Sequence, residues 1–285
     1  MRFSDGLFLL LAMICSASMA IALRFFRTSQ NNRYGMILGN YLTCTLIGFL
    51  MIADKPLLFQ AHPATYVCGL IGGLLFVLSL VCMQSSISSN GTILSSAFSK
   101  LGLLVPLLLS VLFFHEIPSL LQAAGLLLVV ASILIMNGTT KQNTSFSLLF
   151  LLIVLLTNGM SDSMAKIYSS IGYQSEETVY MFILFLFAAM LTYVLMVLET
   201  RRTGKKADLT DLSAGICIGI PNYFSSVLLL RSLRTIPAVI AYPVFSAGTI
   251  MIVSAVSLFL FREHLTRRQT IGLFLILISL VLLNI

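Results

Sequence analysis

One long segment of this chain occurs as two similar copies. Residues 97–137 align without a gap on residues 244–284, at a constant offset of 147 positions. The same offset, extended toward the N-terminus, pairs Gly72 with Gly219 and Ser85 with Ser232. Such a unit is much longer than a solenoid repeat, so each copy is predicted to be a multi-helix half of one protein. The identities within the long segment include Phe98 with Phe245, Ser99 with Ser246, Glu116 with Glu263, Gln122 with Gln269, Gly125 with Gly272 and Asn137 with Asn284.

Both copies consist of apolar runs that are long enough to cross a bilayer. Of the 285 residues, 58% are hydrophobic and 9% are charged, which excludes a soluble domain whose surface faces water. Runs of about 17 to 25 residues recur, and the alternation that a β-barrel needs is absent. The sequence therefore predicts an all-α integral membrane protein with ten transmembrane helices, near residues 7–24, 34–53, 65–85, 92–114, 119–137, 147–169, 178–198, 212–231, 237–261 and 269–285.

The ten spans divide into two repeats of five, at residues 1–138 and 147–285. An odd number of spans per repeat makes the second copy enter the membrane from the opposite side. Matching loops carry opposite charge bias, as the positive-inside rule predicts for inverted repeats. The loop after the first span is basic and its counterpart has Glu176 and Glu177, whereas the loop near Lys55 has a strongly basic counterpart with Arg201, Arg202, Lys205 and Lys206.

The basic residues also predict an orientation in a cell membrane, either a plasma membrane or a bacterial inner membrane. About eleven Lys and Arg residues lie in the odd-numbered loops and about five on the other side, which places both termini outside the cytoplasm. The net charge of +7 can meet anionic lipid there, and nucleic acid is not an expected partner. The five cysteines lack metal-ligand or disulfide spacing, so no metal or cofactor is expected.

Both repeats resemble the EamA domain of the drug/metabolite transporter superfamily. The resemblance rests on the repeated Glu, Gln and Gly described above, on Pro106, and on Gly159 and Lys166, which are seven residues apart. It covers essentially the whole chain, although Ile14 and Ile21 replace the Gly and Lys in the first repeat. It implies a ten-helix carrier that moves small metabolites or drugs outward by alternating access, with both termini inside the cytoplasm.

The ionisable residues that lie inside the predicted spans, and not at their last position, include Lys100, Asp162 and Lys166. A central charge costs roughly 2.5 to 3.5 kcal/mol on insertion scales, so it usually faces a cavity or a partner. Lys100 either lines a cavity or extends its stem to the interface. Asp162 and Lys166 are four residues apart, in the order that favours a salt bridge on one helical face. Asp162 is therefore either a cavity carboxylate that couples transport to protons or half of a structural ion pair, and Lys166 is the second coupling candidate.

Neutral polar residues complete the predicted substrate site. Pro221 is expected to interrupt the eighth span and Pro243 the ninth, because proline removes a helical hydrogen bond and frees a carbonyl. A static kink is the alternative. Glu116 and Glu263 lie at short turns, where a carboxylate can cap the next helix. The neutral candidates for substrate contact are Asn158, Asn222, Tyr223 and Tyr242.

The leading interpretation is a secondary transporter that exports a small metabolite or drug by alternating access. Protons are the candidate coupling ion. A flippase for lipids or lipid-linked sugars is the alternative within transport. From another class, an intramembrane enzyme or a non-transporting scaffold is considered, but the sequence has no recognisable arrangement of nucleophile, base and orienting group. The expected partners are a small-molecule substrate and the bilayer, and the protein is a monomer or a homodimer.

Overall fold

The computed structural model describes residues 3–25, 34–90, 92–137, 148–259 and 266–283, and within these ranges the regular structure is helical. Glu263 lies outside the described residues. The helices of the first half are α1 (Phe3–Phe25), α2 (Tyr34–Met51), α3 (Leu57–Gln60), α4 (Pro63–Asn90), α5 (Thr92–Leu101), α6 (Leu104–Phe113) and α7 (Leu120–Asn137). Those of the second half are α8 (Leu148–Ile171), the 3-10 helix η1 (Gln174–Glu176), α9 (Glu177–Thr203), α10 (Leu209–Ser232), α11 (Ala238–Phe259) and α12 (Arg267–Leu283).

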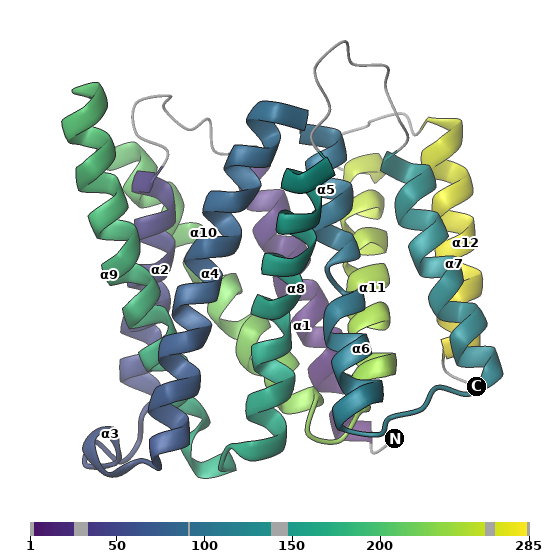
Figure 1. The fold of residues 1–285 in the computed structure, drawn as a ribbon, viewed down its shortest axis with the longest axis horizontal. Helices are drawn as coiled ribbons and strands as arrows, with labels where there is room; N and C mark the ends of the chain where they lie inside the picture. The colour runs from purple at the N-terminus through teal and green to yellow at the C-terminus, as the bar shows by residue number, and fades with distance from the viewer. Residues whose placement is uncertain (1–2, 26–33, 91, 138–147, 260–265, 284–285) are drawn as a thin grey trace.

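Six helical segments in the described ranges are long and apolar enough to cross a membrane: Tyr34–Met51, Pro63–Ile87, Leu148–Ile171, Gln174–Thr203, Leu209–Ser232 and Ala238–Phe259. Shorter apolar helical segments cover Gly6–Ala22, Phe98–Phe113 and Leu120–Met136. The chain is thus an all-helical, multi-pass membrane protein. The longer helices stand roughly side by side in Figure 1, as spans of one bilayer must.

The breaks in the spans differ from those predicted. Helices α10 and α11 run through Pro221 and Pro243 without interruption, so the prediction that these prolines divide their spans was wrong. The predicted fourth span is divided instead, into α5 and α6. Pro106 explains the position, because it falls in the first turn of α6, where a missing N–H is tolerated.

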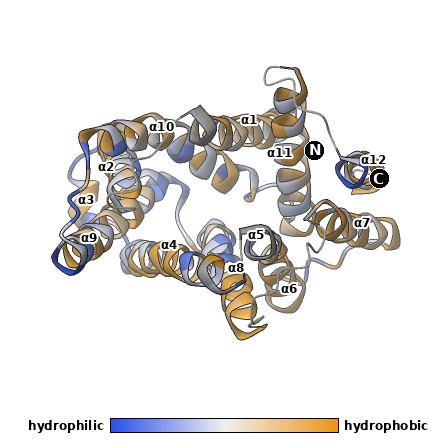
Figure 2. Ribbon diagram, turned by 90° about the horizontal axis from the view of Figure 1, so that it is seen from above, coloured by the Kyte–Doolittle hydropathy of each residue, from blue (hydrophilic) through white to orange (hydrophobic). Residues whose placement is uncertain are grey.

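Eight of the predicted spans form a closed ring. Around it, α2 packs on α10, α10 on α1, α1 on α11, and α11 on α6; the divided span α5–α6 then packs on α8, α8 on α4, α4 on α9, and α9 on α2. Figure 2 looks along the bundle and shows this arrangement, with α7 and α12 beside the ring. Helices α7 and α12 pack mainly on each other and contact α5 and α11 more lightly.

The contact between α7 and α12 is reciprocal. A Cβ placed on Gly125, near the start of α7, would lie 3.1 Å from the carbonyl oxygen of Ser279, near the end of α12. A Cβ on Gly272, near the start of α12, would lie 3.3 Å from the carbonyl oxygen of Ser132 in α7. The start of each helix therefore meets the later part of the other, so the two helices are antiparallel, and glycine allows both close approaches.

Glycines also bring the ring helices together. A Cβ on Gly73 of α4 would lie 2.6 Å from the carbonyl oxygen of Leu184 in α9. A Cβ on Gly39 of α2 would lie 2.5 Å from the carbonyl oxygen of Leu212 in α10. Lipid tails are as apolar as leucine, so close backbone packing is a main source of helix association in membranes. These glycines of α4 and α2 therefore allow close packing against α9 and α10.

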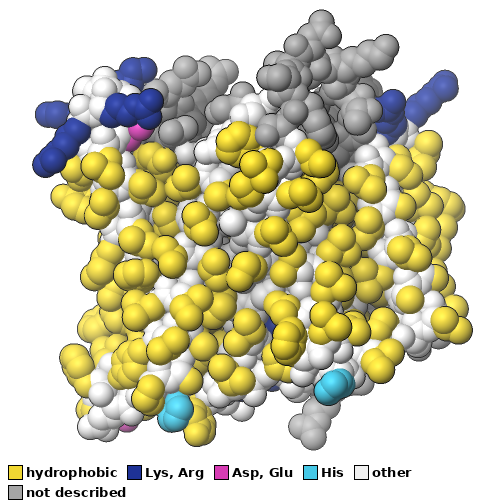
Figure 3. Space-filling model, in the orientation of Figure 1, with side chains coloured by type: hydrophobic (Ala, Val, Ile, Leu, Met, Phe, Trp, Pro, Cys, Tyr) yellow, Lys and Arg dark blue, Asp and Glu magenta, His cyan; other side chains and the backbone are white. Residues whose placement is uncertain are grey.

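The two ends of the bundle differ in charge. One end carries Arg201 and Arg202 in the last turn of α9, and Arg267 and Arg268 at the start of α12. Lys and Arg gather at this end in Figure 3, and we call it the basic face. The opposite end, with the turns that carry Glu116, Glu176 and Glu177, is called the carboxylate face.

Replacing Gly73 by alanine is expected to lower the midpoint of thermal unfolding in detergent. The added methyl group would press on the backbone of α9, and overpacking of this kind costs about 1–3 kcal/mol. Gly6→Ala is the matched control, because a Cβ there has nothing within 4 Å. Equal midpoints for the two variants would show that the α4–α9 approach does not limit stability.

Candidate functional site

The division between α5 and α6 lies against the backbone of α8. A Cβ on Gly102 would lie 3.0 Å from the amide nitrogen of Gly159 and 3.1 Å from the carbonyl oxygen of Leu155. Only a residue without a side chain fits this approach, and Gly159 is equally crowded by Gly102 and Val105. The two glycines therefore fix the point at which the divided span crosses α8.

Lys100 lies in the last turn of α5, directly before this division. Its charge is suited to that place, because the carbonyl end of a helix carries a partial negative charge. The side chain is accessible, and protein atoms lie densely around it. Both properties hold for a group that lines an internal, water-accessible space, and they favour the cavity interpretation of Lys100 over extension to the interface.

Asp162 faces away from the lipid side of α8. Leu152, Leu156 and Met160 form an exposed apolar stripe at intervals of four residues. Asp162 follows Met160 by two positions, which turns it by about 200° around the helix axis. Its carboxylate is exposed, and protein surrounds it. The side chain therefore points from α8 toward the inside of the ring.

The charges of Lys100 and Asp162 interact electrostatically. Within the described residues, neither charged group makes a hydrogen bond or an ion pair at contact distance. A charge in the middle of a membrane protein is costly unless it is paired or hydrated. Lys100 and Asp162 are therefore opposite charges that influence each other without direct contact.

Tyr242 of α11 joins the same region from the neighbouring helix. It is 3% exposed, and its hydroxyl donates a hydrogen bond of 2.6 Å to the carbonyl oxygen of Asp162. Its hydroxyl hydrogen is therefore already used, so Tyr242 positions the backbone of α8 beside the carboxylate. Asn158 lies one turn away on α8 and is also engaged, since its amide donates to the carbonyl oxygen of Val154 at 3.0 Å.

Asn222 and Tyr223 lie on α10, across the ring from α8 in Figure 2. Asn222 donates to the side-chain oxygen of Asn40 on α2 at 3.1 Å. Tyr223 is 1% exposed, and its buried hydroxyl has no partner in the described part of the chain. A buried polar group without a partner costs about 1–3 kcal/mol. The structure thus brings Lys100, Asp162 and Tyr242 together and leaves Asn222 and Tyr223 on the opposite wall.

Lys166 has a different partner from the one predicted. Its ammonium group pairs with Glu116 at 2.5 Å and not with Asp162. The second carboxylate oxygen of Glu116 accepts a hydrogen bond of 2.7 Å from the amide of Ala238, the first residue of α11. Glu116 was predicted to cap the helix that follows it; it instead binds the start of α11, more than a hundred residues later. This contact joins α8, α11 and the turn before α7.

Two further carboxylates hold the same face and were interpreted from the sequence only as loop charges. Glu177 is 3% exposed and pairs with Arg231, at 3.3 Å, and with Arg234, both near the end of α10. Glu176 is 8% exposed and accepts hydrogen bonds from the amide of His62 and the hydroxyl of Thr65 at the start of α4. The sequence signal for these contacts is the pair of adjacent acids, Glu176 and Glu177, in one turn and the arginines Arg231 and Arg234 in another turn on the same side of the membrane.

The comparisons with known proteins were consistent with a membrane protein of this architecture. Residues 180–276 match the family model described as Small Multidrug Resistance protein, and this range covers most of α9 to α12. An uncharacterized protein of Haemophilus influenzae is 24% identical over 278 residues, which are 93% of this chain and 93% of that protein. A protein known from a crystal structure has a similar fold, with a TM-score of 0.75 and 13% identity over 99% of this chain and 96% of that chain.

The family match and the apolar helices together indicate a membrane transporter of the drug/metabolite type. The matching family is related to the drug/metabolite transporter superfamily. The more specific resemblance to the EamA domain stays a prediction, since the model that matches is another one.

Glu116→Gln is expected to lower the thermal midpoint more than the double variant Glu116→Gln/Lys166→Met. The single change leaves the buried Lys166 ammonium without its counter-charge, a situation that costs about 3–5 kcal/mol in fully buried pairs. The cost is expected to be lower here, because the Glu116 side chain is 17% exposed. Additive effects in the double-mutant cycle would contradict a direct interaction.

Proposed function

We propose that this protein is a secondary transporter that exports a small metabolite or drug by alternating access, with Lys100 and Asp162 at the substrate site. The observation that carries the proposal is the pair itself: two opposite charges inside the ring, reachable by water and not bonded to each other. Two separated charges suit a small substrate with an ionised group, since each can attract an opposite charge on the substrate. Tyr223 and Asn222 form the facing wall of the proposed site.

The repeated architecture supports the transport cycle. We infer that residues 1–138 and 147–285 are two inverted repeats of five spans each. The reciprocal contacts of Gly125 and Gly272 support this, because the offset of 147 converts each contact into the other. The same exchange converts the packing of α1 on α10 into that of α8 on α4. Two halves related in this way can exchange conformations and so open a central site to alternate sides.

The contacts of the carboxylate face support a conformation that is closed at that end. Glu116, Glu176 and Glu177 bind groups at the ends of α4, α8, α10 and α11 there. Such a conformation would open toward the basic face. If the basic face is cytoplasmic, as the positive-inside rule predicts, this is the conformation in which an exporter takes up its substrate.

We assign proton coupling to Asp162. The charged and titratable groups that face it are Lys100 on α5 and Tyr242 on α11. A carboxylate that is reachable by water in the middle of a membrane protein can gain and lose a proton as the cavity changes sides. A proton and a cationic substrate group would compete for the Asp162 carboxylate, and this alternation is what proton-driven export requires.

The substrate can be identified by thermal unfolding of the purified protein with amino acids, organic acids, nucleosides, sugars and cationic drugs. A ligand at 100 times its dissociation constant adds about 2.7 kcal/mol to stability. Lys100→Met and Asp162→Asn are expected to abolish the stabilisation by the compound found and its counterflow in liposomes. Asp54→Asn, in an exposed loop, is the control and should behave like the wild type. A hit that both site variants still bind would place the substrate elsewhere.

Asp162→Asn is also expected to remove the pH dependence of transport. Unlike a carboxylate, an amide side chain does not bind and release a proton as the pH changes. Uptake into liposomes across an imposed pH gradient measures this. Counterflow without a gradient shows whether the variant still cycles. An unchanged pH dependence in a folded variant would assign coupling to another group.

A further inference from the structure

A hollow lies on the side of the bundle, at the basic face and away from the proposed substrate site. It encloses about 500 Å³ between the end of α9 and the start of α10. Eight residues line it: Tyr193, Met196, Val197, Thr200, Arg201, Lys206, Ala207 and Leu212. None of these residues belongs to the proposed substrate site.

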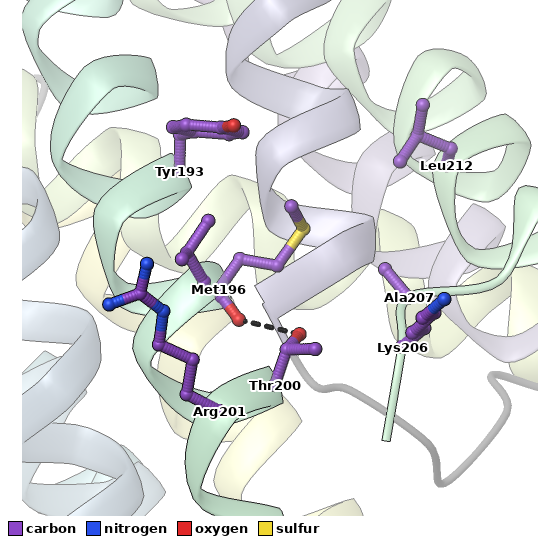
Figure 4. Close-up of a pocket in the computed structure, with 8 residues that line it drawn as sticks. Tyr193, Met196, Thr200, Arg201, Lys206, Ala207 and Leu212 are labelled. Atoms are coloured by element: carbon purple, nitrogen blue, oxygen red, sulfur yellow. Dashed lines mark hydrogen bonds between the residues drawn. The ribbon is translucent and has the colours of Figure 1, made fainter. Parts of the chain in front are cut away.

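The turn between the two helices gives the hollow its shape. Gly204 ends α9 with a φ of 72°, a left-handed conformation that glycine adopts without strain. The chain then returns past Lys206 and Ala207 toward α10. A Cβ on Gly35 of α2 would lie only 2.8 Å from the Cβ of Ala207, so this returning segment rests directly on α2. Figure 4 shows Arg201 on α9 and Lys206 on the returning segment, on opposite sides of the hollow.

The lining is divided into a cationic end and an apolar end. Arg201 and Lys206 are exposed, and neither forms an ion pair within the described residues. Tyr193, Met196 and Val197 continue along α9 toward the middle of the bundle, and Leu212 faces them from α10. Tyr193 lies eight residues before Arg201, about 12 Å along the helix. An exposed tyrosine at that depth is typical of a membrane interface.

We propose that this hollow binds an anionic phospholipid, with the headgroup phosphate between Arg201 and Lys206 and the start of the acyl chains against Tyr193, Met196 and Leu212. The charges match, since Arg202 and Lys205 add to the two lining cations, and these four exceed the three nearby acids, Glu199, Asp208 and Asp211. Basic pockets between membrane helices recognise anionic headgroups in this way. The bound lipid would connect α9 to α10 at the interface. This inference requires a membrane protein and does not depend on the transport proposal.

The test measures thermal unfolding of the full-length protein in detergent with added phosphatidylglycerol, and with phosphatidylcholine of the same acyl chains. Phosphatidylglycerol is expected to raise the midpoint of the wild type, and phosphatidylcholine much less. The double variant Arg201→Gln/Lys206→Gln should need at least about tenfold more phosphatidylglycerol for half of the effect. Arg267→Gln/Arg268→Gln removes the same charge from the same face and should stay within about twofold of the wild type.

Three results would overturn the proposal. Equal losses in the two double variants would mean diffuse attraction to the basic face. Equal stabilisation by phosphatidylcholine would mean that the headgroup charge is not recognised, and equal stabilisation by deacylated glycerophosphoglycerol would mean an anion site without a role for the chains. Lys100→Met separates this proposal from the transport proposal, because it should keep the effect of phosphatidylglycerol in full.

Discussion

A charge inside a membrane must be neutralised or hydrated, and this constraint explains how the ionisable residues of the protein are arranged. Glu116, Glu176 and Glu177 are each bonded to a cation or to the start of a helix, and Lys166 shares the first of them. Asp162 and Lys100 are treated differently, because within the described residues their charged groups make no hydrogen bond or ion pair at contact distance. The bonded charges hold the helices at one face, whereas the other two are the charges that we propose for substrate binding.

The position of that pair depends on helices that approach more closely than ordinary side chains would allow. Gly102 and Gly159 let the divided fourth span touch the backbone of α8, and Lys100 and Asp162 lie two and three residues from this contact. Gly39 likewise lets α2 approach the backbone of α10, and Gly73 lets α4 approach the backbone of α9. The site is therefore positioned by backbone packing, and its charged side chains need not contribute to the stability of the fold.

Much of this arrangement could be predicted from the sequence, because hydropathy and an internal repeat are properties of single segments. The helical spans and the intramembrane charges Lys100 and Asp162 follow from local pattern alone. The partner of Lys166 could not be predicted in this way, since Glu116 lies 50 residues away and only the fold brings it near. The prolines misled the prediction for a related reason: whether Pro221, Pro243 or Pro106 divides a span depends on the helices packed around it. The ten-span inverted repeat and the roles of the site residues remain predictions.

The bridge made by Glu116 has a consequence for the way the carboxylate face can open. One carboxylate holds both the Lys166 ammonium and the first amide of α11, so its two bonds share a single anchoring group. A motion that withdraws the turn before α7 must release both bonds together, and water must then hydrate a carboxylate, an ammonium and a helix end in one event. Partial opening gains little of this hydration, so opening at this contact is expected to be cooperative and not gradual. The rate at which the carboxylate face opens would then depend on the hydration of these groups more than on the stiffness of the helices.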